Sequence, residues 1–215
     1  MLAALTGEIT ATAPRDYVEE LFDIYAAKFD GSLVGNLDYK TPKVMADLVR
    51  NDSNFVFLDS VMDLGCGTGL FGMEIRQFCE NLEGIDISEN MLDQAKIKNI
   101  YDKLHQQDIL DYLSKAILNF DYFVSTDVFI YIGDLSEVFQ LIKFRNKKGG
   151  KLAFSTEDFK GDGFFLEQTG RYSHSKKYIE GLCEKFDLKL CHFEIINLRK
   201  EKDTFIKGGM YILEF

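Results

Sequence analysis

Three glycines at alternate positions behind an acidic residue form the stretch of this sequence with the clearest chemical meaning. Asp63 ends an apolar run and is followed by Gly65, Gly67 and Gly69. Glycine allows a sharp turn from a strand into a helix, and it has no Cβ to obstruct a ligand that approaches the backbone. The spacing therefore predicts a loop that holds a nucleotide-like ligand between a strand and a helix.

The glycine spacing also bears on which ligand this is. The pattern is G-x-G-x-G, whereas the dinucleotide fingerprint G-x-G-x-x-G would need its third glycine where the chain has Leu70. No stretch of the sequence suggests a site for hydride transfer. An NAD-dependent oxidoreductase is therefore the weaker interpretation of the loop.

Two further acids stand where the next two strands are expected to end. Asp86 follows Gly65 by 21 residues (86 − 65), and from that position a carboxylate can accept hydrogen bonds from both hydroxyls of a ribose. Asp108 follows a short strand and could accept a hydrogen bond from the exocyclic amine of adenine. Apolar side chains for the faces of such a ring are Ile87, Met91 and Ile109. With the glycine loop, these acids predict a site for an adenosine-containing ligand.

With these motifs the chain resembles the class I S-adenosylmethionine-dependent methyltransferases. Residues 63–69 are similar to the first motif of that family, residues 84–88 to the second, residues 107–109 to the third and residues 120–131 to its fourth-strand segment. The resemblance covers about residues 14–215. Segments within residues 17–30 and residues 170–175 resemble the methyltransferase domain of bacterial proteins that often carry tetratricopeptide repeats upstream, although this chain has no repeat of roughly 34 residues.

The resemblance implies S-adenosylmethionine as the cofactor and S-adenosylhomocysteine as the product. It also implies that an N-terminal helix covers the cofactor, with Tyr17 or Tyr25 near the methionine end. We expect Thr126, after the fourth predicted strand, to present its backbone carbonyl to the cofactor's ammonium group. The cofactor-binding residues implied in this way are Asp63, Gly65, Gly67, Gly69, Asp86, Ile87, Met91, Asp108, Ile109, Thr126 and Tyr25.

Methyl transfer from a sulfonium makes few demands on side chains, because the leaving group is good and alignment and exclusion of water can supply the acceleration. A general base is needed only when the acceptor starts out protonated. The candidates to face the acceptor are His174 as a base, Tyr131 near the methyl group, and Asp127 as a partner for an amine or for the cofactor's ammonium. Each of the three also has a structural alternative that stays open. His174 could be a histidine at a helix start, Tyr131 a packed aromatic ring and Asp127 a helix cap.

Two functions fit these motifs. The first is an enzyme that transfers a methyl group to a small-molecule acceptor by in-line displacement. The second is a non-catalytic sensor or adaptor that binds the cofactor or its demethylated product, and both need the same cofactor pocket. Only the enzyme needs a second cavity beside the methyl group, which we expect to be lined by Tyr131, Tyr172 and His174. No motif specifies the acceptor or an oligomeric state.

The composition of the chain narrows its partners and its compartment. Its 215 residues carry a net charge of −10, which repels the phosphate backbone of nucleic acids and disfavours a nucleic-acid acceptor. No apolar stretch approaches the length of a membrane span, and the N-terminus has no signal-peptide pattern, so we expect a cytoplasmic protein without a membrane partner. The four cysteines show no metal-binding spacing, and no metal site is expected.

To position these residues, the chain needs strands and helices in alternation. The sequence predicts strands over residues 59–64, 82–86, 102–105, 121–125, 150–155, 188–197 and 205–214, and helices over residues 14–30, 40–50, 69–80, 89–98, 108–118, 134–145 and 174–186. This alternation predicts an α/β fold with a Rossmann-like, mostly parallel sheet and helices on both faces. The family resemblance implies seven strands in the order 3-2-1-4-5-7-6, with the last strand antiparallel. We expect a single domain over residues 1–215, with residues 1–50 as a helical lid and residues 51–215 as the core.

Overall fold

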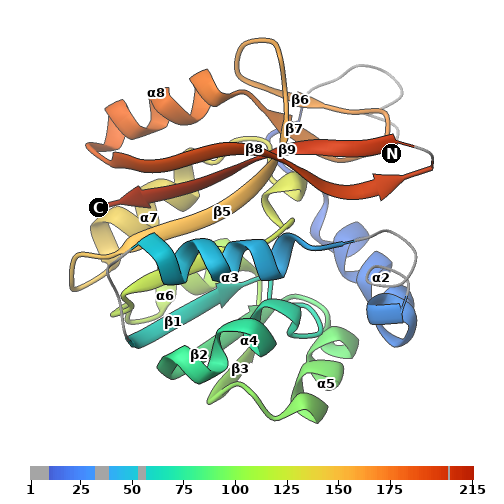
Figure 1. Ribbon diagram of the computed structural model, residues 1–215. Helices are drawn as coiled ribbons and strands as arrows, with labels where there is room; N and C mark the ends of the chain where they lie inside the picture. The colour runs from blue at the N-terminus through green and yellow to red at the C-terminus, as the bar shows by residue number, and fades with distance from the viewer. Residues whose placement is uncertain (1–9, 32–38, 53–56, 203) are drawn as a thin grey trace.

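The computed structural model describes residues 10–31, 39–52, 57–202 and 204–215 (Figure 1). The strands are β1 (Leu58–Leu64), β2 (Cys79–Asp86), β3 (Lys103–Gln106), β4 (Tyr122–Ser125), β5 (Lys151–Asp158), β6 (Phe164–Leu166), β7 (Tyr172–His174), β8 (Lys189–Glu201) and β9 (Thr204–Glu214). The α-helices are α2 (Arg15–Tyr25), α3 (Thr41–Asp52), α4 (Leu70–Ile75), α5 (Glu89–Lys98), α6 (Ile109–Lys115), α7 (Ser136–Arg145) and α8 (Lys176–Phe186). Short 3-10 helices are η1 (Ala26–Lys28), η3 (Arg76–Phe78) and η4 (Phe129–Tyr131).

One mixed sheet organises the molecule. β1 pairs in parallel with β2 and β4, β2 with β3, and β4 with β5. β9 lies antiparallel to β5, and β8 lies antiparallel to β9. The long strands therefore have the order β3-β2-β1-β4-β5-β9-β8, which corresponds to the expected 3-2-1-4-5-7-6. The α/β fold class and the antiparallel last strand are confirmed.

Two short strands add to the seven that were expected. β6 and β7 form an antiparallel hairpin, and β7 pairs in parallel with the end of β5. Glu157 of β5 pairs with Gly208 of β9 and also with Ser173 of β7, so β9 and β7 lie on opposite edges of β5. Strands of three residues are too short to show an alternating pattern in the sequence. The hairpin places Arg171, directly before β7, close to the end of β5.

Some element boundaries differ from the prediction because the flanking residues pair with neighbouring strands. β2 begins earlier than expected, at Cys79, and the preceding helical segment ends at Phe78. β8 continues to Glu201, beyond the end predicted at residue 197, because Arg199 pairs with Ile206 in the β8–β9 ladder. Arg199 is therefore part of a strand.

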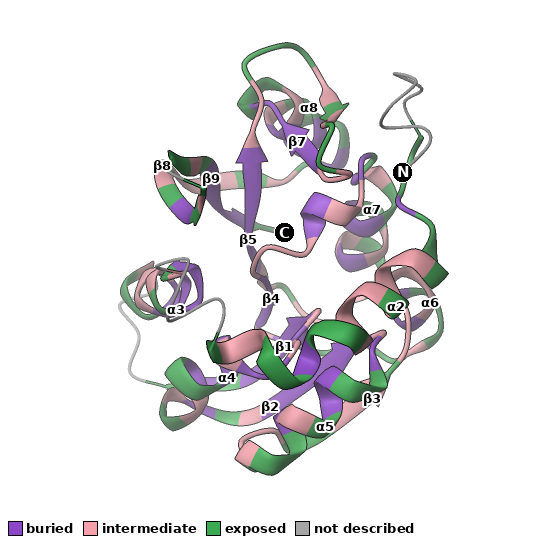
Figure 2. Cartoon of the chain, turned by 90° about the vertical axis from the view of Figure 1, so that its right-hand side faces the viewer, coloured by how far each residue is buried: buried purple, intermediate pink, exposed green. Residues whose placement is uncertain are grey.

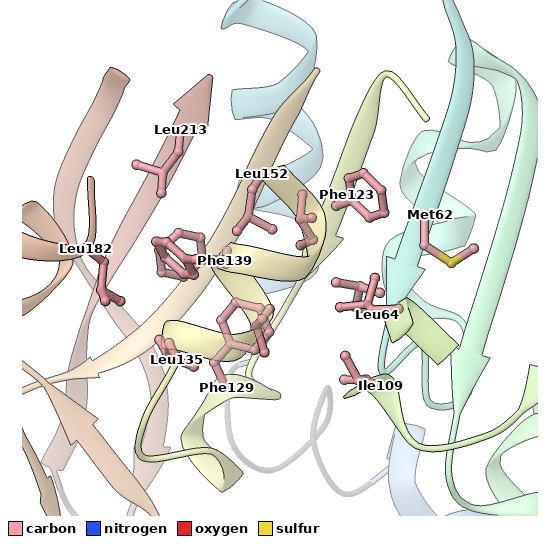
Figure 3. Close-up of a cluster of buried hydrophobic side chains, with 14 of the residues drawn as sticks. Met62, Leu64, Ile109, Phe123, Phe129, Leu135, Phe139, Leu152, Leu182 and Leu213 are labelled. Atoms are coloured by element: carbon pink, nitrogen blue, oxygen red, sulfur yellow. The ribbon is translucent and has the colours of Figure 1, made fainter. Parts of the chain in front are cut away.

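Residues of the central strands alternate between two buried faces of the sheet. On one face α6, α7 and α8 pack against Met62, Phe123, Leu152 and Leu213, as the close-up in Figure 3 shows for Phe139 and Leu182 of the helices. On the other face α3 and α4 pack against Val61, Val124, Ala153 and Ile212. Burial on both faces explains the near-continuous apolar runs of the parallel strands.

The first two described helices differ in their role. α3 buries Met45, Ala46 and Val49 against the sheet, so it belongs to the core. α2 has no fully buried residue and lies over the carboxyl-terminal edge of the parallel strands, the edge that Figure 2 faces. The lid boundary expected at residue 50 thus falls inside a core helix, and α2 with the turn after it forms the cover. Within the described ranges no helix is both long enough and apolar enough to cross a bilayer.

Candidate active site

A cavity of about 540 Å³ lies at the carboxyl ends of the parallel strands, beneath α2. Its walls come from the loops after β1, β2, β3 and β4, around the point where the strand order reverses between β1 and β4. The residues that we term the cofactor end are Gly65, Gly67, Asp86, Ile87, Met91, Asp108 and Ile109. The residues that we term the acceptor end are Tyr39, Asp127, Tyr131, Arg171 and Arg199.

The glycine loop turns so close to the loop after β4 that a side chain does not fit at its first glycine. Gly65 has a φ of +73°, and a Cβ there would lie 2.5 Å from Cγ2 of Val128. Gly67 (φ +53°) is different, since no atom of the described residues lies within 4 Å of a Cβ built on it. A side chain at Gly67 would therefore extend into the open cavity, where the bare backbone can instead contact a ligand.

Backbone amides hold Asp86 at the end of β2. Its Oδ2 accepts a hydrogen bond from the N–H of Gly67 (2.8 Å), and its Oδ1 accepts one from the N–H of Ser88 (2.9 Å). Burial raises the pKa of the Asp86 carboxyl to about 6, although these hydrogen bonds oppose the shift. The result is a fixed carboxylate in the cavity wall, which suits the two hydroxyls of a ribose.

Two of the residues expected to bind the cofactor lie behind the loop instead of in the cavity wall. Asp63 is buried, and its Oδ2 accepts a hydrogen bond from the Tyr101 hydroxyl (2.6 Å). Burial raises the pKa of Asp63 to about 7. Gly69 (φ +89°) directly precedes α4, and a Cβ there would lie 3.0 Å from the Tyr101 ring. Asp63 and Gly69 thus support the loop from behind, and their contact with the cofactor stays a prediction.

Asp108 combines a structural contact with a place in the cavity wall. It is the N-cap of α6, where its Oδ1 accepts a hydrogen bond from the N–H of Asp111 (3.1 Å). The same oxygen lies 3.1 Å from Nη2 of Arg15, on the covering helix α2. Apolar residues beside it in the wall are Ile87, Met91 and Ile109. This part of the cavity thus has an acid at its edge and apolar faces, as expected for an adenine pocket.

Two acidic residues fasten the cover onto the cofactor end. Asp23 of α2 accepts a hydrogen bond from the Ser88 hydroxyl (2.6 Å). Asp30, after η1, accepts hydrogen bonds from Thr68 Oγ1 (2.5 Å) and from Lys98 Nζ (2.6 Å). Apolar and aromatic residues of the cover that face the cavity are Val18, Leu21, Phe22, Tyr25 and Phe29. They shield the cavity from water on this side.

Asp127 is anchored by residues of distant strands. Its backbone has a φ of +56°, in the left-handed region that Asp adopts more readily than most residues. Its N–H donates to Ser155 Oγ (2.8 Å), and the Ser155 hydroxyl donates to Asp127 Oδ1 (3.0 Å). Its Oδ2 accepts a hydrogen bond from Nη1 of Arg199 (3.2 Å). Both carboxylate oxygens of Asp127 are therefore engaged by protein donors, and Thr126 beside it lines the cavity.

A chain of ion pairs continues from Arg199 to a second arginine. Arg199 donates through Nη2 to Glu157, and Glu157 also accepts a hydrogen bond from Nε of Arg171 (2.8 Å). Nη2 of Arg171 donates to Glu201 (2.8 Å). Arg199 is 8% exposed and Glu157 is 6% exposed, and charges buried to this extent require partners. Both arginines line the cavity, whereas the two glutamates lie outside its wall.

Two tyrosines complete the acceptor end. Tyr131 packs edge to face against Phe22 of α2, with ring centroids 5.4 Å apart. Burial raises the pKa of Tyr131 to about 12. Burial and the nearby charge of Asp127 raise the pKa of Tyr39 well above its usual value. Both hydroxyls remain protonated at neutral pH, so they can donate hydrogen bonds and do not act as bases.

His174 is not part of the cavity. It is fully buried at the end of β7, with Nε2 3.0 Å from the carbonyl oxygen of Ile132 and 2.9 Å from that of Gly133. Burial lowers the pKa of His174 to about 4. Tyr172 is fully buried as well, with its hydroxyl 2.6 Å from Thr10 Oγ1. The expectation of a His174 base, in a cavity that Tyr172 and His174 line, is therefore wrong, because both residues are buried in a paired strand. His174 directly precedes Ser175, the N-cap of α8, and contacts backbone carbonyls, which agrees with its structural alternative.

The remaining predicted residues come together around one cavity. Its wall includes Tyr25, Gly65, Gly67, Asp86, Ile87, Met91, Asp108, Ile109, Thr126, Asp127 and Tyr131. The structure adds Tyr39 and Arg199, which the sequence analysis did not identify. Arg199 belongs to a run of charged residues that is typical of a solvated turn. Arg199 could have been identified if this run had been recognised as a strand, since a strand directs one charged side chain of the run toward the interior.

Comparison with known proteins shows the family of the chain. Residues 58–209, more than two thirds of the sequence, match a family described as Methyltransferase domain. The chain is 31% identical over 122 residues to malonyl-[acyl-carrier protein] O-methyltransferase 2 of Ilyobacter polytropus, which covers 53% of this chain and 44% of that protein. It is 29% identical over 99 residues to ubiquinone biosynthesis O-methyltransferase of Coxiella burnetii, covering 45% of this chain and 42% of that protein. The matches thus span less than half the length of these relatives.

Solved structures share the fold over nearly the whole chain. One is magnesium protoporphyrin IX methyltransferase from Synechocystis PCC 6803 with bound S-adenosylhomocysteine, with a TM-score of 0.70 and 16% identity over 93% of this chain and 98% of that one. Another is an S-adenosylmethionine-dependent methyltransferase from Clostridium acetobutylicum, with a TM-score of 0.62 and 20% identity over 91% and 99% of the two chains. The chain therefore belongs to the methyltransferase domain family and has the fold of class I S-adenosylmethionine-dependent methyltransferases, as its motifs indicated.

Proposed function

We propose that this protein transfers the methyl group of S-adenosylmethionine to a small-molecule acceptor by in-line displacement, with S-adenosylhomocysteine as the product. The observation that carries the proposal is the extent of the cavity. Besides the residues of the cofactor end, its wall includes Tyr39, Tyr131, Arg171 and Arg199. A protein that only senses the cofactor needs no such extension, so a sensor is the less well supported alternative.

The residues of the cofactor end fit the parts of S-adenosylmethionine. Asp86 would accept hydrogen bonds from the ribose hydroxyls, and Asp108 would accept one from the adenine amine, between Ile87 and Ile109. The bare backbone at Gly67 leaves room for the methionine portion, and Thr126 would face its ammonium group. The cofactor supplies a methyl group activated on a sulfonium.

The chain's own contribution to the chemistry is alignment and exclusion of water. Phe22 and Tyr25 line the cavity from the side of α2, and Tyr131 packs against Phe22. No cavity-lining histidine occurs in the described part of the chain. Asp127, Tyr131 and Tyr39 position the acceptor in this proposal and abstract no proton from it. An oxygen acceptor is supported by the named relatives, which are O-methyltransferases.

Isothermal titration of the purified protein with S-adenosylmethionine and S-adenosylhomocysteine tests the cofactor, with NADH as the comparison ligand. We expect micromolar binding of the two sulfur ligands and none of NADH. The Asp86→Ala variant should lose the binding, because the carboxylate that holds the ribose is gone. The Asp93→Ala variant is the matched control, since Asp93 pairs with Lys96 on the surface of α5. A folded protein that binds neither sulfur ligand would overturn the proposal.

Two finer expectations stay predictions. One is a particular closeness to methyltransferase domains that follow tetratricopeptide repeats, and the other is a cytoplasmic location. A nucleic-acid acceptor remains disfavoured by the net charge of −10. Size-exclusion chromatography with light scattering would determine the oligomeric state.

A further inference from the structure

The ion-pair chain beside the acceptor end presents its two arginines to the cavity. As far as the structure describes the chain, the wall at this end contains Arg171 and Arg199 and one carboxylate, that of Asp127. The other two acids of the ion-pair chain, Glu157 and Glu201, lie outside the wall. The ion-pair chain as a whole has two guanidinium groups and three carboxylates, but the side of it that lines the cavity presents both arginines, so a ligand there meets N–H donors.

The two arginines still have donors to offer. A guanidinium has five N–H groups. Among the described residues, Arg171 directs its Nε to Glu157 and one Nη2 hydrogen to Glu201. Arg199 directs one hydrogen each from Nη1 and Nη2 to Asp127 and Glu157. The acids thus hold both guanidinium groups in place and leave N–H groups for an oxyanion, and such a fork matches the two oxygens of a carboxylate.

In the part of the chain that the structure describes, the acceptor end also presents no group that is placed to deprotonate an acceptor. The hydroxyls of Tyr39 and Tyr131 are held protonated by burial. Asp127 has both oxygens engaged by Ser155 and Arg199. His174 lies outside the cavity wall. An alcohol, a phenol or an ammonium group would need a base at this position, whereas a carboxylate arrives already ionised.

We propose that the acceptor is a carboxylic acid, which binds as its carboxylate to Arg171 and Arg199 and is methylated on a carboxylate oxygen. In this step a lone pair of that oxygen forms the O–CH₃ bond while the S–CH₃ bond breaks and its electron pair passes to sulfur. The products are a methyl ester and S-adenosylhomocysteine, and no proton is transferred. The inference rests on the proposed methyltransferase function.

Physical chemistry also indicates how the arginines would act. The negative charge of the carboxylate decreases as the O–CH₃ bond forms, so the arginines stabilise the bound acid more than they stabilise the transition state. Loss of Arg171 should therefore raise KM for the acid more than it lowers kcat. The carboxylate of the cofactor's methionine portion competes with the acceptor for binding to the two arginines. The experiment must therefore distinguish cofactor binding from acceptor binding.

The test uses S-adenosylmethionine with a tritiated methyl group and a panel of short mono- and dicarboxylic acids, each matched with its primary amide, amine and alcohol. Label that alkali releases as methanol identifies a methyl ester, because ethers and methylamines are stable to alkali. Binding of each acid to the protein saturated with S-adenosylhomocysteine is measured in parallel by calorimetry. Cofactor binding in the same titrations reports on the proposed function separately.

The variants are Arg171→Met, Arg171→Lys and, as a control for the loss of one charge, Arg50→Met, which removes an exposed pair with Asp47. We expect at least one acid to bind and to give alkali-labile product. Arg171→Met should raise KM for that acid by about tenfold or more. The KM of Arg171→Lys should lie between those of the unaltered protein and Arg171→Met, because lysine keeps the charge without the forked guanidinium. Binding of S-adenosylhomocysteine should change less than about twofold in every variant.

Three results would overturn the carboxylate proposal while leaving the methyltransferase function in place. The first is that no acid binds to the protein saturated with S-adenosylhomocysteine. The second is label that goes only into alkali-stable products of the amines or alcohols. The third is a loss of S-adenosylhomocysteine affinity in Arg171→Met that matches the loss for the acid, which would assign the arginine to the cofactor. Circular dichroism of each variant confirms that the fold is retained.

Discussion

The two ends of the cavity are built in opposite ways. The cofactor end consists of loops that follow consecutive strands, and Asp86 is held by amides of Gly67 and Ser88, at most 19 positions away. The acceptor end joins residues from across the chain, since Asp127 binds Ser155, 28 positions away, and Arg199, 72 positions away. The first end depends on backbone geometry and the second on buried charge. Substitutions at the cofactor end and at the acceptor end should therefore affect the protein in different ways.

The largest expected effect is at the acceptor end, where Arg199→Met removes the central cation of the ion-pair chain. It leaves Asp127 and Glu157 buried without their partner, and breaking a buried ion pair in this way costs about 3–5 kcal/mol. We expect the free energy of unfolding, measured by urea denaturation, to fall by that amount. Lys103→Met is the control, because Lys103 is exposed and its pair with Glu83 should contribute about 1 kcal/mol or less. Equal losses in the two variants would contradict the difference between the ends.

A smaller effect is expected for Gly65→Ala at the cofactor end. Alanine would be strained at a φ of +73°, by about 1–2 kcal/mol, and its Cβ would overlap Val128 at 2.5 Å, which adds about 1–3 kcal/mol unless the loop moves. We expect lower stability and a large loss of S-adenosylhomocysteine affinity, measured by denaturation and calorimetry. Gly181→Ala on α8 is the control, because no described atom lies within 4 Å of its Cβ. Unchanged affinity in Gly65→Ala would show that the loop does not shape the site.

The pH dependence of cofactor binding follows from Asp86. Its pKa is raised to about 6 by burial, and the protonated carboxyl can no longer accept from both ribose hydroxyls. The Kd of S-adenosylhomocysteine should therefore be flat above about pH 6 and rise about tenfold per pH unit below it. Folding stability changes with pH in the opposite direction to cofactor affinity. The raised pKa of Asp86 contributes its full stabilisation of the fold below pH 3.8, the pKa of the carboxyl in the unfolded chain, and this contribution is lost as the pH rises through about 6. Calorimetry across this range is the measurement, and Asp86→Asn should bind weakly without the pH dependence.

The smallest expected effect concerns the cover. Asp30→Asn weakens the contacts with Thr68 and Lys98 that fasten the residues after η1 to the glycine loop. Because Asp30 is partly exposed, the change should cost about 1 kcal/mol or less and raise the dissociation rate of S-adenosylhomocysteine about threefold. Stopped-flow fluorescence would measure the rate, with Asp93→Asn on the surface of α5 as the control. No change in the rate would indicate that the apolar contacts of α2 alone hold the cover.

Much of the fold could be predicted because its signals are local. Each strand–loop–helix unit shows its own apolar run and its turn, and Ser88 and Asp108 cap the helices that follow β2 and β3. The strands β6 and β7 escaped prediction because three residues carry no pattern. His174 was misplaced for the same reason. Once Tyr172–His174 pairs with β5, the histidine is turned into the interior, away from the cavity.

The sequence by itself determined the family and the cofactor end, because glycine conformation and strand-end acids act over a few residues and are visible as spacing. The tertiary structure alone decided the acceptor end. Nothing near Arg199 in the chain indicates that it meets Asp127 and Glu157, since that contact exists only when β8 pairs with β9 and β9 with β5. Pairing between distant strands converts a charged residue that would be solvated in a turn into a buried one. For that physical reason the residues proposed to choose the acceptor could be identified only in the folded chain.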